Sequence, residues 1–342
     1  MRLKIILLTA SLGLAALISC GGGGSSGSAL TPLNPNPPIS WSEVTGGTSM
    51  QFYGSGLQMG YGEFITLGCD SADSLGGKPT VTSTADGSTW TTTQVNLPFT
   101  NISFTSLAFG NGTFVAVGIE AILAYSTDGS SWNPVTAGIG TELISSVAFG
   151  DGIFVATLPG TTNNQYMTST DGQTWSSLKN VSQTVSANIP TVFFANGKFI
   201  ITSGETAYVS TDDTSTWNPE IIITPQGTLS ASLSGLAYGG GHYVIGTNSG
   251  YIATSNDFDT WTVTSNQSGT PIYTLAYING VFVASSGPKI LWSVDGTTWS
   301  SATVGNPGDF YRGFAYGNGM YLGIGSTSGQ GSPQTGFTVK GM

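Results

Sequence analysis

The chain alternates between short apolar runs and glycine-containing polar turns. In the clearest stretch, apolar runs over 103–109 and 113–118 flank Gly110-Asn111-Gly112, and runs over 121–126 and 131–136 flank Asp128-Gly129. An Asn-Gly or Asp-Gly pair between two apolar runs is the strongest short signal for a β-hairpin. The pattern therefore predicts a unit of four antiparallel strands joined by tight turns.

The first of these hairpins recurs along the chain with an aromatic residue two positions after the last glycine of its turn. The seven aromatic residues are Phe64, Phe114, Phe154, Phe199, Tyr243, Phe282 and Tyr321. The recurrence indicates an internal repeat, and the repeat indicates the architecture more strongly than any single strand does.

The second hairpin carries an Asp–Trp motif, clearest in 126–132, with the sequence Ser-Thr-Asp-Gly-Ser-Ser-Trp. Its six aspartate and tryptophan pairs are Asp86 and Trp90, Asp128 and Trp132, Asp171 and Trp175, Asp212 and Trp217, Asp257 and Trp261, and Asp295 and Trp299. The first copy, counted from Ser83, has one extra residue, and the copies at Asp212 and Asp257 are degenerate. Successive tryptophans are 42, 43, 42, 44 and 38 residues apart, a period typical of stacked four-stranded units.

We expect the motif to be structural and not catalytic. Ser, Thr and Asp side chains bond the backbone one or two residues further along, and Gly adopts the positive φ of a tight turn. The indole is large enough to fill the space between adjacent units.

The predicted fold is an all-β, seven-bladed β-propeller over 39–342. A sheet that is apolar on both faces cannot stand alone, and a radial arrangement buries each face on the next blade. A seventh tryptophan, Trp41, has no hairpin before it, and 335–340 reads as a third strand that lacks a fourth. We therefore expect the N-terminal strand to close the last blade, which leaves no sheet edge open between the first and last blades.

The N-terminal region has the pattern of a bacterial lipoprotein signal. Residues 1–19 combine a basic start with an apolar run, and 17–20 read Leu-Ile-Ser-Cys, which resembles a lipobox. The resemblance implies cleavage before Cys20 and its lipidation, with export and anchoring to the cell envelope, at the outer membrane or the cell surface. Residues 20–38 would form a Gly/Ser/Pro tether, which would hold the propeller roughly 25–40 Å from the membrane. Ordinary secretion, with Cys20 incidental, is the alternative.

Composition narrows the choice of partners. Removal of Arg2 and Lys4 with the signal would leave six basic and eighteen acidic residues, a net charge of −12. So acidic a surface disfavours nucleic acid and anionic lipid headgroups, so the only membrane contact we expect is through the lipid. One histidine and two cysteines supply no zinc set, and no phosphate loop or dinucleotide fingerprint appears. We expect a monomer with no cofactor and no metal.

The Asp–Trp motifs resemble the Asp-box, or bacterial neuraminidase repeat, of sialidases, sortilin-type receptors, some xyloglucanases and the photosystem II assembly factor. The resemblance covers essentially all of 39–342 and implies a propeller of that kind, but that family mixes enzymes with binding proteins. Its sialidases hold the substrate carboxylate with three arginines. After signal removal this chain keeps only Arg312, which argues against a sialidase.

A glycoside hydrolase with two paired carboxylates remains an alternative, because such a site needs only two acids at a suitable separation. The acids outside the motifs include Glu63, Asp70, Asp73, Glu120, Glu142, Glu205, Glu220 and Asp309. Nothing in the sequence pairs any two of them, so whether the chain is an enzyme stays open, with binding favoured.

Ligand recognition is expected on the side of the disc that carries the uneven loops. These loops are 69–78, 94–101, 137–141, 158–165, 178–187, 219–228, 265–270 and 301–309. A rigid scaffold with irregular loops is the usual arrangement for recognition. Candidate ligand residues there are Glu120, Glu205 and Arg312. The sequence thus predicts a non-catalytic propeller that binds an extracellular or periplasmic glycan or protein. A membrane-complex assembly role is a further alternative.

Overall fold

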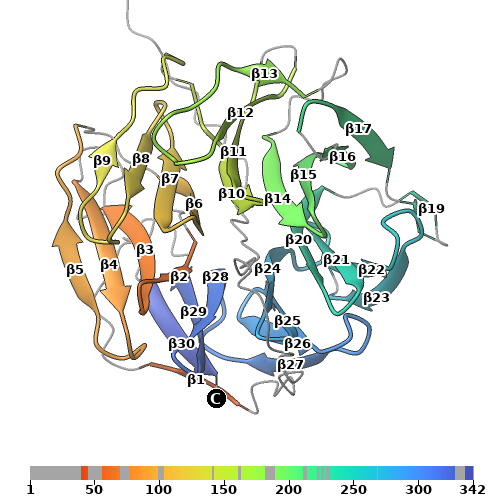
Figure 1. The fold of residues 1–342 in the computed structure, drawn as a ribbon. Helices are drawn as coiled ribbons and strands as arrows, with labels where there is room; N and C mark the ends of the chain where they lie inside the picture. Colours follow the sequence, from red (N-terminus) through yellow and green to blue (C-terminus); the bar gives the residue numbers. More distant parts are fainter. Residues whose placement is uncertain are drawn as a thin grey trace, which may run out of the picture.

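A computed structural model describes residues 40–44, 56–69, 78–98, 104–140, 142–160, 163–181, 189–210, 214–221, 223–224, 227–228, 232–267, 269–327 and 336–341. Its strands form seven four-stranded antiparallel sheets, arranged as blades in a ring around a central axis (Figure 1). The prediction of an all-β, seven-bladed propeller is therefore confirmed. The described ranges contain no helix, and so none that could cross a membrane.

Each blade runs outward from an innermost strand. Blade 1 consists of β2 (Gln58–Gly60), β3 (Glu63–Cys69), β4 (Pro79–Thr84) and β5 (Thr91–Gln94). Blade 2 consists of β6 (Phe104–Gly110), β7 (Thr113–Gly118), β8 (Leu123–Ser126) and β9 (Asn133–Pro134). Blade 3 consists of β10 (Ser146–Gly150), β11 (Ile153–Leu158), β12 (Gln165–Ser169) and β13 (Lys179–Asn180). Blades 4 and 5 consist of β14 (Thr191–Ala195), β15 (Lys198–Ser203), β16 (Thr206–Ser210) and β17 (Trp217–Ile221); and β20 (Leu233–Gly239), β21 (His242–Thr247), β22 (Tyr251–Ser255) and β23 (Thr262–Asn266). Blades 6 and 7 consist of β24 (Ile272–Ile278), β25 (Val281–Ser286), β26 (Lys289–Ser293) and β27 (Ser300–Thr303); and β28 (Asp309–Gly317), β29 (Met320–Thr327), β30 (Gly336–Gly341) and β1 (Trp41–Glu43).

The two ends of the described chain close blade 7 together. Strand β1 pairs antiparallel with β30, with Trp41 opposite Gly341 and Glu43 opposite Val339. The Trp41 indole is buried and packs edge-on against Phe314, with 5.6 Å between ring centroids. Closure by the N-terminal strand therefore agrees with the prediction, and β30 is paired on both sides.

The predicted first hairpin is present in every blade, and its turn is of type I′. Each has two successive residues with positive φ: Tyr61-Gly62, Asn111-Gly112, Asp151-Gly152, Asn196-Gly197, Gly240-Gly241, Asn279-Gly280 and Asn318-Gly319. This turn matches the right-handed twist of the flanking strands, and Asn and Gly tolerate its left-handed backbone.

The asparagines of these turns also join neighbouring blades, a role that the sequence did not indicate. Asn111 Nδ2 donates to the carbonyl oxygens of Gly152 and Thr170 in the next blade, at 3.1 and 3.2 Å. Asn318 Nδ2 donates to Gly62 and Ala85, both at 2.8 Å, and so ties blade 7 to blade 1. The turn residue therefore stabilises both its own hairpin and the ring.

The hydrophobic core lies in layers between adjacent blades. Trp132 of blade 2, for example, packs in one cluster with Ile65 and Leu67 of blade 1. Trp217 packs in another with Val155 and Tyr166 of the preceding blade. The prediction that each indole fills the space between units is confirmed for these residues, because a propeller blade has no core of its own.

Two features differ from the sequence prediction. Strand β9 is shorter than the predicted 131–136, and Pro134 within it has no N–H to donate. The loop predicted over 219–228 is partly regular, since β17 extends to Ile221 and β18 (Ile223–Thr224) pairs with β19 (Gly227–Thr228).

Candidate binding site on the loop face

The disc has two unlike faces. One, here called the hairpin face, carries the type I′ turns and the Asp–Trp turns; the other, the loop face, carries the second turn of each blade and the connections between blades. On the loop face these two kinds of segment are bonded to each other: Ala121 N–H donates to the Glu142 carbonyl at 2.6 Å, and Gln267 N–H to Gly250 at 2.8 Å. In these two places the connection between blades is therefore held against the second turn of a blade.

The Asp–Trp turns of the hairpin face have a structural role. Asp128 Oδ1 accepts the backbone N–H groups of Ser131 and Ser130 at 2.6 and 2.8 Å, and the Ser126 hydroxyl at 3.0 Å. The N–H of Ser131 is the main reason that the pKa of the Asp128 carboxyl is lowered to about 2. Asp171, Asp257 and Asp295 accept the equivalent three bonds. A carboxylate whose accepting oxygen is occupied in this way is suited to fixing a turn.

The first copy of the motif starts one residue later than the sequence analysis predicted. Thr84 Oγ1 donates to Asp86 Oδ1 at 3.1 Å and accepts Gly87 N–H at 2.9 Å, the bonds that Ser126 makes in blade 2. The motif therefore starts at Thr84 and not at Ser83, and the prediction of one extra residue is wrong. Either hydroxyl residue could serve as the start, and only the geometry distinguishes them.

The two degenerate copies are built differently. Blade 5 keeps the full set of bonds, with Phe258 at φ 73° where the copies of blades 1, 2, 3 and 6 have Gly. Asp212 of blade 4 lies outside the described residues. There Thr214 has φ 56°, and its carbonyl accepts the hydroxyl of Tyr166 from blade 3 at 2.8 Å. The tryptophan Nε1 donates to the equivalent carbonyl in blades 2, 3, 5 and 6.

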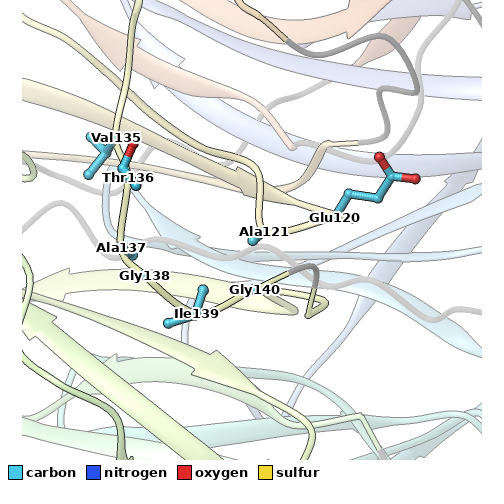
Figure 2. Close-up of a pocket in the computed structure, with 8 residues that line it drawn as sticks. All are labelled: Glu120, Ala121, Val135, Thr136, Ala137, Gly138, Ile139 and Gly140. Atoms are coloured by element: carbon cyan, nitrogen blue, oxygen red, sulfur yellow. The ribbon is translucent and has the colours of Figure 1, made fainter.

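A hollow of about 220 Å³ opens on the loop face between blades 2 and 3. It is lined by Glu120 and Ala121 of the β7–β8 turn and by residues 135–140 of the β9–β10 connection. Figure 2 shows the Glu120 carboxylate directed away from the 135–140 segment, so the walls are mainly backbone and small apolar side chains. Glu120 and Ala121 have φ of 52° and 57°, a left-handed turn without glycine. Such backbone strain is uncommon for Ala and Glu and is often found at functional sites.

A second feature of the loop face lies at the innermost strands of blades 6 and 7. The guanidinium carbon of Arg312 lies 4.7 Å from the centroid of the Phe310 ring, and Arg312 Nε donates to Ser326 Oγ at 3.1 Å. Phe310 also packs against Tyr273, with centroids 5.5 Å apart. Each of the three side chains is half-buried. Tyr273, Phe310 and Arg312 thus form a continuous row, called the aromatic–arginine row below.

Hydrogen bonds hold the connection that leads into this row. The buried Tyr311 hydroxyl donates to the Val304 carbonyl at 2.7 Å, and Asn306 N–H donates to Asp309 Oδ2 at 2.6 Å. Burial, with smaller effects from the charges of Asp309 and Glu43, raises the pKa of Tyr311 well above its usual value, so the hydroxyl stays a donor. These bonds hold residues 304–309 in place beside the row.

The three predicted ligand residues are not brought to one place. Glu120 lies in blade 2, Glu205 in the second turn of blade 4 and Arg312 in blade 7, which are well separated around the ring (Figure 1). All three are on the loop face, but only Arg312 lies in the aromatic–arginine row. Sequence reasoning missed Tyr273 and Phe310. An alignment of the innermost strands would have singled out Tyr273, because Thr105, Ser145 and Ser234 occupy its position in other blades.

The carboxylates outside the motifs give no buried pair within the described part of the chain. Glu120 and Glu142 lie on bonded segments, and both side chains are exposed. A general acid in a glycoside hydrolase needs a buried setting. Asp309 is buried in blade 7, and Asp70 and Asp73 lie outside the described residues. Across the described ranges, no group of three or more His, Cys, Asp or Glu side chains could hold a metal ion.

Comparison with protein families finds a match to the DUF6242 beta propeller domain over residues 137–279, less than half of this chain. Among curated proteins nothing matches. Similar solved structures include YCF48 from Cyanidioschyzon merolae, with a TM-score of 0.62 and 15% identity over 88% of this chain and 98% of that one. YCF48 bound to D1 peptide gives 0.58 and 16% over 90% and 96%, and virginiamycin B lyase from Staphylococcus aureus gives 0.66 and 10% over 89% and 98%. At these identities the likeness shows the fold alone, and the chain is a β-propeller similar in part to the DUF6242 domain.

Proposed function

We propose that this protein is a cell-envelope lipoprotein with a non-catalytic propeller of the Asp-box kind, which binds a glycan or a protein through its loop face. The observation that carries this proposal is the aromatic–arginine row. Aromatic side chains and arginine are the residue types enriched where proteins bind partners. They occur here as a contiguous, half-buried row at the inner strands, in a chain with only two arginines.

The position of the tether supports recognition on this face. The chain enters β1 at Trp41, which pairs with Gly341 at the hairpin-face end of β30, and then runs towards the loop face. A tether before residue 40 therefore joins the propeller on the hairpin face. An anchor at Cys20 would attach on that side and leave the loop face turned away from the membrane.

The settings of the carboxylate side chains support binding over catalysis. The Asp–Trp carboxylates are occupied by backbone bonds, and the exposed pair Glu120 and Glu142 lacks the burial of an acid and base pair. A protein partner is the second candidate ligand, because a solved propeller of similar fold, YCF48, is bound to a peptide.

The test uses the purified lipidated protein as bait against two kinds of material. A glycan array is probed in parallel with a pull-down from intact cell envelopes, each with wild type and an Arg312→Gln, Phe310→Ala double variant. Capture of a glycan or a protein by wild type, lost in the folded double variant, supports the proposal. Equal capture by both, or hydrolysis of a captured glycan by wild type, contradicts it.

A further inference from the structure

The hollow between blades 2 and 3 is bordered by a segment whose backbone is unpaired. Residues 136–140 leave the outermost strand of blade 2 and cross the loop face towards the innermost strand of blade 3. Val135 N–H still donates to the Leu123 carbonyl at 2.8 Å, but residues 136–140 make no hydrogen bond within the described part of the chain. Their N–H and C=O groups can therefore bond a partner, as those at the edge of a sheet can.

Apolar side chains hold this segment in place. Val135, Ala137 and Ile139 are half-buried and pack against the apolar layer between blades 2 and 3, whereas the residues between them are exposed. The backbone is thus positioned without hydrogen bonds of its own, and little order has to be gained when a partner binds.

The outer side of the segment is open. A Cβ added to Gly138 or Gly140 would meet no other atom of the described chain within 4 Å. Glycine allows a second backbone to approach closely, because no side chain covers the peptide groups. A partner's main chain can therefore reach hydrogen-bonding distance of residues 136–140.

The size and lining of the hollow limit what it can hold. Its volume of about 220 Å³ is smaller than the roughly 300–1,000 Å³ of sites that enclose a drug-sized ligand, so it suits one side chain of a longer molecule. Ala121, Val135, Ala137 and Ile139 supply aliphatic walls, and none of the eight lining residues is aromatic (Figure 2). An aliphatic side chain fills such a hollow, whereas a saccharide ring offers hydroxyl groups in its place.

The charge around the hollow is negative. Glu120 and Glu142 are exposed, and their segments are joined by the bond from Ala121 N–H to the Glu142 carbonyl. The sequence has no lysine, arginine or histidine over 79–178, a range that includes all of blade 2. Complementary charges favour encounter and select the partner, so a basic residue beside the aliphatic one is favoured here.

We propose that the hollow and residues 136–140 bind an extended polypeptide segment of a partner protein. Its main chain bonds the unpaired groups of 136–140, an aliphatic side chain fills the hollow, and a lysine or arginine two residues away lies near Glu120 and Glu142. Alternate residues of an extended chain face the same side, which gives this spacing. The inference rests on the proposed function, since it uses the same loop face, but it assigns a contact separate from the aromatic–arginine row.

The test selects ligands for the purified full-length protein, in detergent, from a display library of short random peptides. We expect the enriched peptides to share an aliphatic residue with a basic residue two positions away. The most enriched peptide is then measured by isothermal calorimetry. Methylation of the backbone nitrogens beside its aliphatic residue should weaken binding about tenfold or more, because main-chain bonds are lost. Replacement of its basic residue by glutamate should weaken binding about threefold or more.

Two variants block the site in different ways. Gly138→Asn keeps a residue that tolerates φ 68° and places a side chain in the open space, and Ala137→Leu fills the hollow. Each should weaken the peptide about tenfold or more, because main-chain bonds or the buried aliphatic contact are lost. Each is checked for an unchanged thermal melting profile, and if Gly138→Asn melts early, Ala137→Leu decides the question.

The matched control is Gly269→Asn, on the loop face in the connection between blades 5 and 6. Gly269 also has positive φ, at 82°, and a Cβ there would likewise meet no other described atom within 4 Å. The control and the Arg312→Gln, Phe310→Ala double variant should both bind the peptide within about twofold of wild type, because they lie far from the hollow.

Four results would overturn the inference: no enriched peptide, enrichment of acidic peptides, equal binding of the methylated peptide, or equal binding by Gly138→Asn and Ala137→Leu. Loss of peptide binding in the Arg312→Gln, Phe310→Ala double variant alone would place the peptide at the aromatic–arginine row. That result would reject the site at the hollow and leave the proposed function intact. The glycan array and the envelope pull-down judge the proposed function separately, since they depend on the double variant and not on Gly138 or Ala137.

Discussion

Trp41 lies opposite Gly341 in the β1–β30 ladder, so the first described strand of the chain completes the last blade. Its indole lies between blades 6 and 7, in one cluster with Val281, Val283 and Phe314. The ring is thus closed by one short strand that depends on a single large side chain.

We therefore expect Trp41→Ala to destabilise the protein by about 3–5 kcal/mol, the range for loss of a buried aromatic side chain. Ser42→Ala, at an exposed position of the same strand, should cost less than about 0.5 kcal/mol. Equilibrium urea unfolding measures both. Equal unfolding midpoints for the two variants would show that β1 does not hold the ring closed.

The Asp–Trp turns predict a defined acid sensitivity. Backbone N–H groups, first that of Thr89 for Asp86 and that of Ser131 for Asp128, lower the pKa of both carboxyls to about 2. A lowered folded-state pKa contributes stability that is complete above the unfolded value near 4. That contribution is lost as the pH falls through 4 towards 2. Thermal melting between pH 6 and 2 should show this loss.

A matched pair of variants in blade 5 isolates the effect. Asp257 accepts the N–H groups of Thr260 and Asp259, and the first of these is the main cause of its lowered pKa. Asp257→Asn should lower stability at pH 7 and flatten the loss between pH 4 and 2. Asp259→Asn, whose exposed side chain lies in the same turn, should do neither. Identical pH profiles for the two variants would contradict this role of the turn carboxylate.

Phe258 offers a test of strain against packing. Its side chain is buried, its φ is 73°, and its ring packs on Tyr243 and Trp261. At the equivalent position of blade 2 there is no room for a side chain, because a Cβ added to Gly129 would lie 2.5 Å from Ile65. Phe258→Ala loses packing and keeps the strain, so it should cost about 3–5 kcal/mol. Phe258→Gly should recover about 1–2 kcal/mol of this by relieving the left-handed backbone. If urea unfolding gives the same free energy for Phe258→Ala and Phe258→Gly, the left-handed backbone at this position carries no strain.

The asparagine clamps predict a local effect between blades 7 and 1. Asn318→Gly keeps a residue that tolerates φ 49° and removes the two bonds to Gly62 and Ala85. We expect a loss of about 1–2 kcal/mol, since two carbonyls lose a donor at an exposed edge. Amide exchange should rise at the hairpins of those two blades and stay unchanged in blade 4. A uniform rise around the ring would mean that the clamp acts globally.

Lipidation is tested at Cys20. Wild-type protein expressed in a bacterium with a lipoprotein pathway should partition into detergent and carry a diacylglycerol mass on its N-terminal cysteine. Cys20→Ser should lack that mass and enter the aqueous phase. A variant that still partitions with the detergent would show that the membrane association has another origin.

Much of this fold could be predicted because its signals are local and repeated. Asn111-Gly112 and its counterparts specify a hairpin wherever they occur, and the spacing of the tryptophans sets the size of a blade. The start of the first Asp–Trp motif was less predictable, since Ser83 and Thr84 carry the same chemical group. Their roles differ only in which hydroxyl reaches Asp86.

The candidate site, unlike the fold, could be predicted only in part. Arg312 was identified by its rarity, but its neighbours Phe310 and Tyr273 were not, and Glu120 and Glu205 lie in other blades. Tyr273 of blade 6 and Arg312 of blade 7 are one repeat apart, so the sequence places them at equivalent positions of adjacent blades, but only the structure shows that Phe310 lies against both. A bulge in each strand directs them to the same side.

The sequence by itself determined the repeat, the turn type, the number of blades and the source of the closing strand. Each of these depends on residues close together in the chain, or on an edge that must be covered. Only the tertiary structure decided which side chains meet at the loop face. Innermost strands of different blades converge there at the axis, and a contact across that convergence has no trace in local sequence.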